Sequence, residues 1–414
     1  MRTDRKKILF FAEGITMTHF VRPAALAETL DPTQWDVYFW TPRRYHPLLR
    51  QSFSQLGELE TMEPATFLDR LARGDSAYPA DVLHRYVLDE LRILEEIRPD
   101  LVIGDFRLSL CVSAPLRKTP FAFIFNAQWS PYRRQPAIVP DVPITKWISP
   151  TVLNPVYAIL RPAFFFLHAK PLNDVRRAFG LSRISHDMRD VYTAGDLVFY
   201  PDIPEFVPLD SPPAHHHFVG VCPWELDSPK PAWWEEVMAF PEPKVFVSLG
   251  SSGPIRVLPA VLEALSTLPV KVIVTTSGRA VDALGSNVYA TDLLPYEDTS
   301  RRCAVVVSHG GTGSLYPALS AGTPMLAIPG NIDNHLSADL LQRSGAGLQV
   351  RVEYATPQRL RSAISQLIAD HSFKASASKW AAAMARYDTK TIFPRILNEW
   401  FAGRNGSADS GTLR

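Results

Sequence analysis

A glycine-rich segment in the C-terminal third of the chain combines an imidazole with hydroxyl side chains. It runs from Ser308 to Ser314, SHGGTGS, and follows a short apolar run, Ala304–Val307. A helical pattern, LYPALSAG, comes next and closes at Gly322. A glycine-rich turn that leads into a helix presents backbone N–H groups and the positive end of the helix dipole, which suits a phosphate. The segment predicts a phosphate site; the alternative is a tight turn with a capping serine.

A histidine and an aspartate near the N-terminus are candidates for proton transfer. His19 follows the first apolar run, in GITMTHFVRP, and we expect it in a turn before a helix that has Pro23 in its first turn. Asp105 ends another apolar run, PDLVIGD. Open parallel sheets place ligands at the carboxyl ends of strands, so both residues are expected at one edge. A neutral imidazole can accept a proton, and a carboxylate stabilises the imidazolium that results. The alternatives are a loop histidine and a helix-capping aspartate.

The elements that position these residues follow a β-α-β pattern. Short apolar runs alternate with amphipathic stretches, which is typical of parallel sheets. The expected strands are Ile8–Phe11, Val37–Trp40, Leu101–Ile103, Phe121–Phe125, Leu197–Tyr200, Val245–Leu249, Val270–Thr275, Ala304–Val307 and Met325–Ile328. Helical patterns include Ala24–Leu30, Asp81–Ile97 and Val175–Phe179. The sequence therefore predicts an α/β protein.

The length of 414 residues and a proline-rich interruption indicate two domains. Residues 201–232 carry eight prolines, and the three histidines His215–His217 in this stretch are expected to be solvated. We expect an N-terminal domain, a linker, a C-terminal domain, a helix that bridges back and a disordered tail, at residues 1–218, 219–240, 241–380, 381–403 and 404–414, respectively.

The composition excludes several classes of protein. The 43 basic and 42 acidic residues nearly balance, so bulk charge directs the chain neither to nucleic acid nor to an anionic membrane. The three cysteines lie far apart, without disulfide or metal-ligand spacing, which favours a cytoplasmic location. The apolar run Ile8–Ala12 is too short for a signal peptide and is expected to be a buried strand.

The longest apolar stretch, Pro155–His168, is interrupted by Arg161 and Pro162. It is shorter than the roughly 20 residues of a membrane-spanning helix. A core helix, an acceptor-pocket helix and a membrane-surface helix all fit it, and the first two are favoured. Contact with a membrane is thus allowed but not required.

Residues His309–Pro324, HGGTGSLYPALSAGTP, resemble the signature of the family-1 UDP-glycosyltransferases of the GT-B fold, H-x-G-x-x-[ST]-x-x-E-A-L-x-x-G-x-P. The similarity continues through Asp333-Asn334 and Gly345–Gly347. It extends more weakly to SLGSSG (Ser248–Gly253) and DLLPY (Asp292–Tyr296). The chain is most similar to the bacterial natural-product or macrolide type within this family.

The resemblance implies two Rossmann-like domains that face a cleft, with the acceptor on the N-terminal domain and the nucleotide-sugar donor on the C-terminal one. It implies His19 as general base and Asp105 as its orienting partner. The residues expected to bind the donor are Gly14, Ser251, His309, Gly311, Thr312, Gly313, Ser314, Asp333 and Asn334. Of these, Asp333 and Asn334 would bind the sugar hydroxyls. The donor is a co-substrate, and neither a metal nor another cofactor is expected.

Three positions depart from the family pattern and indicate altered recognition of the nucleoside. Pro317 stands where the family has a glutamate that binds the ribose, and proline cannot bind a diol. Leu293 replaces a tryptophan that stacks on the base in many members, and Asn334 replaces a glutamine. A dTDP-sugar, whose deoxyribose lacks the 2′-hydroxyl, would tolerate the loss of the glutamate, so UDP and dTDP both stay open.

The function expected from the sequence is an inverting transfer of a sugar from UDP or dTDP to a hydroxyl of a hydrophobic small molecule. The aromatic and apolar character of residues 125–168 suggests the nature of the acceptor. A dinucleotide oxidoreductase is disfavoured, because GITMTHF lacks G-x-G-x-x-G. A nucleotide-sugar epimerase or hydrolase and a weakly catalytic or non-catalytic partner protein remain as alternatives. No nucleic-acid partner is expected.

Overall fold

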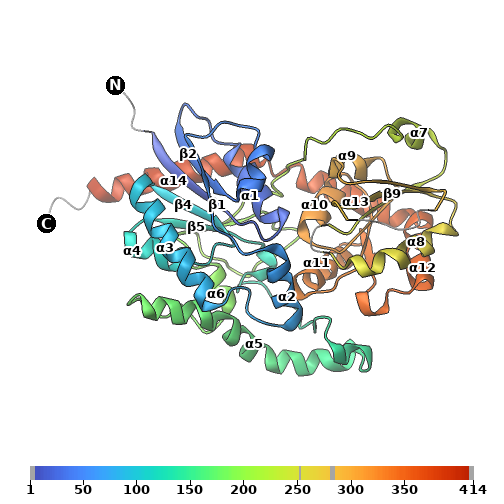
Figure 1. Cartoon of the computed structure of the whole chain (residues 1–414), viewed down its shortest axis with the longest axis horizontal. Helices are drawn as coiled ribbons and strands as arrows, with labels where there is room; N and C mark the ends of the chain where they lie inside the picture. Colours follow the sequence, from blue (N-terminus) through green and yellow to red (C-terminus); the bar gives the residue numbers. More distant parts are fainter. Residues whose placement is uncertain (1–4, 251–252, 280–284, 410–414) are drawn as a thin grey trace.

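Two parallel sheets, each covered by helices, form the chain. The computed structural model describes residues 5–250, 253–279 and 285–409, and every strand pair within them is parallel (Figure 1). Parallel strands buried on both faces need continuous apolar runs, as in Ile8–Ala12 and Val245–Val247. The expected α/β fold is confirmed.

The first sheet holds the N-terminal strands. Its spatial order is β3 (Gln55–Glu58), β2 (Trp35–Thr41), β1 (Lys6–Ala12), β4 (Leu101–Asp105), β5 (Phe121–Ile124), β6 (Leu197–Tyr200) and β7 (His216–Phe218). The α-helices of this half are α1 (Met17–Ala27), α2 (Pro64–Arg73), α3 (Ala80–Ile97), α4 (Leu110–Arg117), α5 (Pro150–Ala178) and α6 (Met188–Tyr192).

The second sheet follows the proline-rich segment. Its spatial order is β10 (Val288–Thr291), β9 (Lys271–Thr275), β8 (Lys244–Ser248), β11 (Val305–Ser308), β12 (Met325–Ala327) and β13 (Gly347–Gln349). The α-helices of this half are α7 (Trp234–Ala239), α8 (Leu258–Ser266), α9 (Tyr296–Arg301), α10 (Thr312–Ser320), α11 (Ile332–Arg343), α12 (Pro357–Ala369), α13 (His371–Met384) and α14 (Thr389–Asp409).

Helix α14 returns from the second half to the first sheet (Figure 1). Phe393 of α14 is fully buried, with its ring 5.0 Å from that of Phe199 and 6.4 Å from that of Phe10. The helix continues to Asp409, so the described part of the expected disordered tail is helical.

The register of the strands places the carboxyl ends of β1 and β4 together. Ala12 pairs with Asp105 in the parallel ladder, and helix α1 begins at Met17, shortly after β1 ends. In the second sheet, Ser308 at the end of β11 pairs with Ser248 of β8. The chemistry-bearing segments therefore lie at the carboxyl edges of both sheets.

Three local expectations are wrong. His19 lies inside α1, and Pro23 is in the helix interior, because the helix starts earlier than the apolar pattern suggested. His215–His217 is not a solvated run, since β7 takes up His216 and the Tyr200 hydroxyl lies 2.7 Å from the His216 Nδ1. The stretch Pro155–His168 is neither core nor pocket wall for most of its length, because its apolar side chains in α5 are largely exposed.

Candidate active site

His19 and Asp105 lie together at the carboxyl edge of the first sheet. The His19 Nδ1 is 2.7 Å from Asp105 Oδ1; the aspartate side chain is fully buried and that of the histidine is 17% exposed. An Nδ1–H that donates to Asp105 leaves Nε2 of the imidazole as a proton acceptor. This is the geometry of an oriented general base.

Arg22 is a third member of this group that the sequence analysis did not identify. Its Nε donates to Asp105 Oδ2 at 2.7 Å and its Nη2 to Asp105 Oδ1 at 2.5 Å, a bidentate ion pair. Its Nη1 donates to Asn126 Oδ1 at 2.6 Å. Burial lowers the pKa of Arg22, but the Asp105 carboxylate more than offsets this and raises it. The carboxylate beside His19 is thus already paired with a permanent cation.

Phe106 forms one side of the histidine environment. It has a φ of 56°, the left-handed region that side chains with a Cβ avoid, directly after Asp105. Its ring stacks on the His19 imidazole with centroids 5.1 Å apart, and it also packs against Phe125 and Tyr192. The strained backbone directs an aromatic ring onto the His19 imidazole and excludes water from one of its faces.

The N-terminus of helix α10 faces α1 across the two halves. A Cβ added to Gly313 would lie 2.4 Å from Thr18 Oγ1, and one added to Gly311 would lie 2.7 Å from the His309 Nε2. Any larger residue at either position would therefore collide with Thr18 or His309 unless that side chain moved. The first N–H groups of α10 and its dipole present a positive end in the same place.

His309 is buried beside this helix end, and burial lowers its pKa to about 4. It is a neutral imidazole near pH 7, so it can serve a diphosphate by hydrogen bonding but not by charge. The Ser314 hydroxyl donates to the Gly311 carbonyl oxygen at 2.9 Å, and Thr312 Oγ1 donates to Asn126 Oδ1 at 3.3 Å. Both expected donor-binding hydroxyls thus have protein partners.

A cleft of about 590 Å³ lies between the two halves. His309, Thr312, Gly313 and Ser314 line it from the C-terminal half, opposite Arg22 and other residues of the N-terminal half. Leu293 and Pro317, two of the positions that differ from the family pattern, also line the cleft. The cleft therefore brings together the helix end and the positions where the family recognises the nucleoside.

Asp333 and Asn334 lie at the start of helix α11, away from the cleft lining. Asp333 Oδ1 accepts hydrogen bonds from Gln128 Nε2 at 2.6 Å and from the Trp129 indole Nε1 at 2.7 Å. Asn334 is buried, and its backbone N–H donates to Asn331 Oδ1. Gln128 and Trp129 come from the first half, so Asp333 connects the halves; the sequence offered a signal for them only in the aromatic segment NAQWSPY.

Three other expected donor-binding residues are not placed in the cleft lining by the described structure: Gly311, which is the N-cap residue of α10, Gly14 and Ser251. Gly14 packs against Pro42 and Thr61, and its carbonyl oxygen accepts a hydrogen bond from Arg44 at 2.6 Å. Ser251 lies outside the described residues. Pro317 is in the interior of α10, not in its first turn, so its missing N–H removes the helical bond to the Gly313 carbonyl oxygen.

Comparisons with known proteins identify the class. Residues 259–396 match the family described as "Erythromycin biosynthesis protein CIII-like, C-terminal domain". Among solved structures, the spinosyn rhamnosyltransferase SpnG complexed with thymidine diphosphate superposes with a TM-score of 0.66 at 19% sequence identity. The superposition covers 95% of this chain and 100% of SpnG. The chain therefore has the two-domain fold of SpnG, the GT-B fold.

Relatives at higher identity define the family. A PGL/p-HBAD biosynthesis rhamnosyltransferase of Mycobacterium bovis (strain BCG / Pasteur 1173P2) is 38% identical over 383 residues, which cover 92% of this chain and 85% of the relative. A PGL/p-HBAD biosynthesis glycosyltransferase of Mycobacterium tuberculosis (strain ATCC 25177 / H37Ra) is 37% identical over 380 residues, which cover 92% of this chain and 89% of the relative. The chain belongs to this family of glycosyltransferases, which confirms the enzyme class expected from the sequence.

Proposed function

We propose that the enzyme transfers a deoxysugar of the rhamnose type from thymidine diphosphate to a hydroxyl of a hydrophobic acceptor, with inversion at the anomeric carbon. The observation that carries the proposal is the His19–Asp105 contact of 2.7 Å. It lies directly behind Thr18 and Arg22 of α1, which line the cleft opposite the N-terminus of α10. The names of the relatives support rhamnose, and SpnG with bound thymidine diphosphate supports the nucleotide.

In the proposed mechanism, the acceptor oxygen attacks the anomeric carbon from the face opposite the diphosphate. Its proton passes to Nε2 of His19, and Asp105 stabilises the imidazolium. The bond between the anomeric carbon and the phosphate oxygen breaks as the new glycosidic bond forms. The diphosphate departs with its negative charge near the N–H groups that open α10, where the helix dipole favours it. No metal takes part in this scheme, and we place the reaction in the cytoplasm.

The replacement of the ribose-binding glutamate by Pro317 supports dTDP over UDP. The side chain lines the cleft and offers no acceptor for a 2′-hydroxyl. A deoxyribose has no hydroxyl there, so the substitution costs a dTDP donor little. Thermal-shift measurements with UDP, dTDP and GDP test this directly, because a ligand that binds the native state raises the melting temperature. A larger shift with UDP than with dTDP would exclude the thymidine nucleotide.

Product analysis tests the reaction itself. The enzyme is incubated with dTDP-rhamnose, with and without a phenol that carries a short alkyl chain, and the products are separated and their anomeric configuration is determined by NMR. We expect a glycoside of inverted configuration only when the phenol is present, at a rate unaffected by EDTA. Consumption of the donor without acceptor would instead indicate an epimerase or a hydrolase.

A further inference from the structure

Three polar side chains of helix α5 bind neighbouring parts of the protein. The Arg161 Nη1 donates to the Gln135 carbonyl oxygen at 3.0 Å, and Asn154 Oδ1 accepts from the Val139 backbone N–H at 2.9 Å. Asn173 Nδ2 donates to a backbone oxygen of the loop that follows α5, at 2.9 Å. Up to about residue 167, most apolar side chains of α5 therefore point to solvent, the reverse of the pattern of a helix on a globular protein. In the last turns the usual pattern returns, because Leu172 and Val175 are buried and the pair of Lys170 and Asp174 is exposed.

The outward side of α5 is apolar. Within the described part of the chain, most of the large hydrophobic side chains that are exposed belong to α5 and the segment just before it. We define the apolar face of α5 as these residues: Ile144, Trp147, Ile148, Val152, Val156, Ile159, Leu160, Phe166 and Leu167. Ile159 is 79% exposed and Trp147 is 89% exposed. The helical members recur at spacings of three and four residues and span roughly 22 Å along one side.

The charged side chains within the segment that forms the apolar face of α5 are basic. From Val142 to Asn173 the chain contains no Asp or Glu, and Lys146 and Lys170 lie at the two ends of the face. Lys170 pairs with Asp174 one turn further on, and Asp174 also contacts Arg177, so the three groups together keep one net positive charge. An exposed apolar stripe flanked by cations complements an anionic lipid surface, and Trp147 is a residue type that favours the membrane–water interface.

Helix α5 is long and apolar enough to cross a membrane by length and composition alone, but its contacts favour a position on the surface. The inward face is held by Arg161 and Asn154, and Tyr354 Oη of the second half donates to the Thr145 carbonyl oxygen at 2.8 Å. A spanning orientation would break these bonds. In Figure 1, α5 runs along the lower edge of the molecule, beneath α2 and α6.

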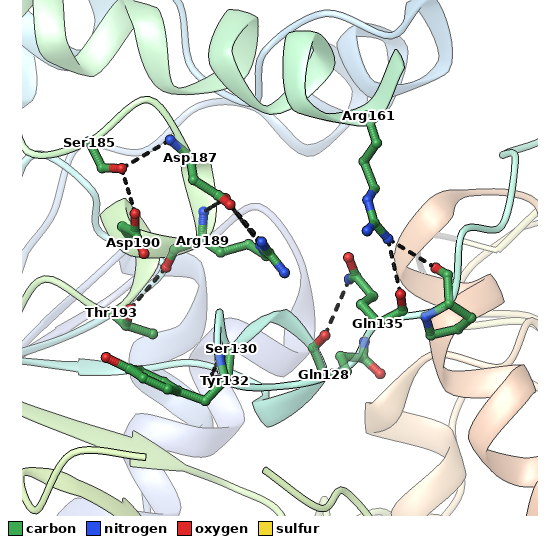
Figure 2. A network of polar contacts seen from close by, with 11 residues as sticks. Gln128, Ser130, Tyr132, Gln135, Arg161, Ser185, Asp187, Arg189, Asp190 and Thr193 are labelled. Atoms are coloured by element: carbon green, nitrogen blue, oxygen red, sulfur yellow. Dashed lines mark hydrogen bonds and ion pairs between the residues drawn. The ribbon is translucent and has the colours of Figure 1, made fainter. Parts of the chain in front are cut away.

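A chain of hydrogen bonds connects α5 to the site. Arg161 donates to the Gln135 carbonyl oxygen, and Gln135 Nε2 donates to the Gln128 carbonyl oxygen at 3.3 Å (Figure 2). Gln128 Nε2 in turn donates to Asp333 Oδ1. Residues 128–135 therefore connect α5 to Asp333, the residue that joins the two halves.

We propose that the apolar face of α5 docks the enzyme on an anionic phospholipid surface, from which it takes its hydrophobic acceptor. The origin of the acceptor rests on the proposed function, whereas the docking itself does not. Since Lys146 and Lys170 flank the apolar face, binding requires both insertion of apolar side chains and anionic headgroups.

Co-sedimentation of the full chain with vesicles tests the docking. Vesicles of phosphatidylcholine with about a quarter phosphatidylglycerol are compared with pure phosphatidylcholine. We expect Ile159→Glu/Leu160→Glu to lower the partition coefficient at least about tenfold, because two apolar side chains no longer insert. The matched control Leu88→Glu/Leu116→Glu changes two exposed leucines on α3 and α4 and should bind like the native chain.

A second variant tests how much the positive charge of Lys146 contributes to vesicle binding. Lys146→Gln should lower binding to the anionic vesicles about fivefold and leave binding to neutral ones unchanged. The control is Lys379→Gln, which removes an exposed lysine of α13. Equal sedimentation of the native chain and the α5 double variant would overturn the proposal. So would a native dimer that the double variant converts to a monomer, since the apolar face would then be covered by a second copy.

An activity measurement separates docking from transfer. With a long-chain phenol embedded in anionic vesicles, the α5 double variant should lose at least about tenfold in rate. With a water-soluble phenol its rate should match that of the native enzyme, which also shows that it is folded. Equal losses on both acceptors would contradict a docking role. Absence of transfer by the native enzyme to either phenol would count against the proposed function and leave the vesicle-binding result standing.

Discussion

His19, Asp105 and Arg22 form the cluster to which the proposed proton transfer is assigned. Removal of the imidazole should abolish proton transfer without disturbing the opposite side of the cleft. We expect His19→Ala to lower kcat by about 10²–10⁴-fold, the usual contribution of a general base, with the Kd for dTDP unchanged in calorimetry. His84→Ala, which removes an exposed histidine of α3, is the control. A His19→Ala enzyme with native turnover would exclude His19 as the base.

Arg22 should set the pH range in which the base works. Its guanidinium neutralises the Asp105 carboxylate, and its raised pKa keeps it charged at every working pH. In Arg22→Gln the carboxylate is uncompensated and holds the imidazolium form of His19 more strongly. We expect the acidic limb of the kcat/KM profile to move to higher pH.

Arg22→Lys keeps the charge but loses the bidentate geometry. Its acidic limb should therefore lie between those of the native enzyme and of Arg22→Gln. Identical pH profiles of all three enzymes, with only kcat reduced, would mean that Arg22 has a purely structural role.

The pairing of His19 with Asp105 was predictable, but Arg22 was missed for a definable reason. His19 was placed in a turn, and only within a helix does a residue three positions later share its side. Once α1 is known to begin at Met17, the spacing of His19 and Arg22 puts both next to Asp105. The contact of Gln128 with Asp333 joins residues from different halves. The aromatic segment NAQWSPY marks Gln128 as a candidate but does not indicate its partner.

At the scale of elements, the strands that the sequence analysis missed are the four sheet edges: β3, β7, β10 and β13. Interior parallel strands are buried on both faces and read as continuous apolar runs. An edge strand is covered less, so its residues need not be apolar, as His216–Phe218 and Gln55–Glu58 show. The central strands and the positions at their ends were therefore predictable, whereas the width of each sheet was not.

Helix α10 allows a direct test of nucleotide choice. Pro317→Glu restores the carboxylate that binds the ribose in the wider family, on a helix that already lines the cleft. We expect it to raise the affinity for UDP relative to dTDP by about tenfold, since a hydrogen bond to a charged group contributes roughly 1.5–3 kcal/mol.

Pro317→Ala is the matched control, because it restores the N–H of the helix without the carboxylate. Calorimetric titration of both variants with UDP and dTDP gives the comparison. An unchanged ratio of affinities in Pro317→Glu relative to Pro317→Ala would show that Pro317 does not determine the nucleotide.

At the scale of the whole molecule, buried titratable groups couple stability to pH with opposite signs. Burial raises the pKa of Glu13 to about 7, although Arg107 lies beside it. The contribution of Glu13 to the free energy of unfolding is therefore complete below about pH 4.5 and is lost as the pH rises through about 7. Burial lowers the pKa of His335 to about 3, so its contribution is complete above pH 6.5 and is lost as the pH falls toward 3. Because both groups act on the same quantity, the stability of the native protein as a function of pH reports only their sum.

A difference measurement isolates the histidine. Between pH 6.5 and about 3 the unfolded chain binds a proton at His335 that the folded chain excludes. The free energy of unfolding therefore decreases as the pH is lowered through this range. His335→Gln removes this uptake. The native stability minus that of the variant should therefore decrease by up to about 1.4 kcal/mol for each pH unit below 6.5, measured by urea denaturation. His371→Gln, at an exposed position of α13, should show no such slope. A pH-independent difference for His335→Gln would mean that the folded protein accommodates the imidazolium, and that α11 opens to water there.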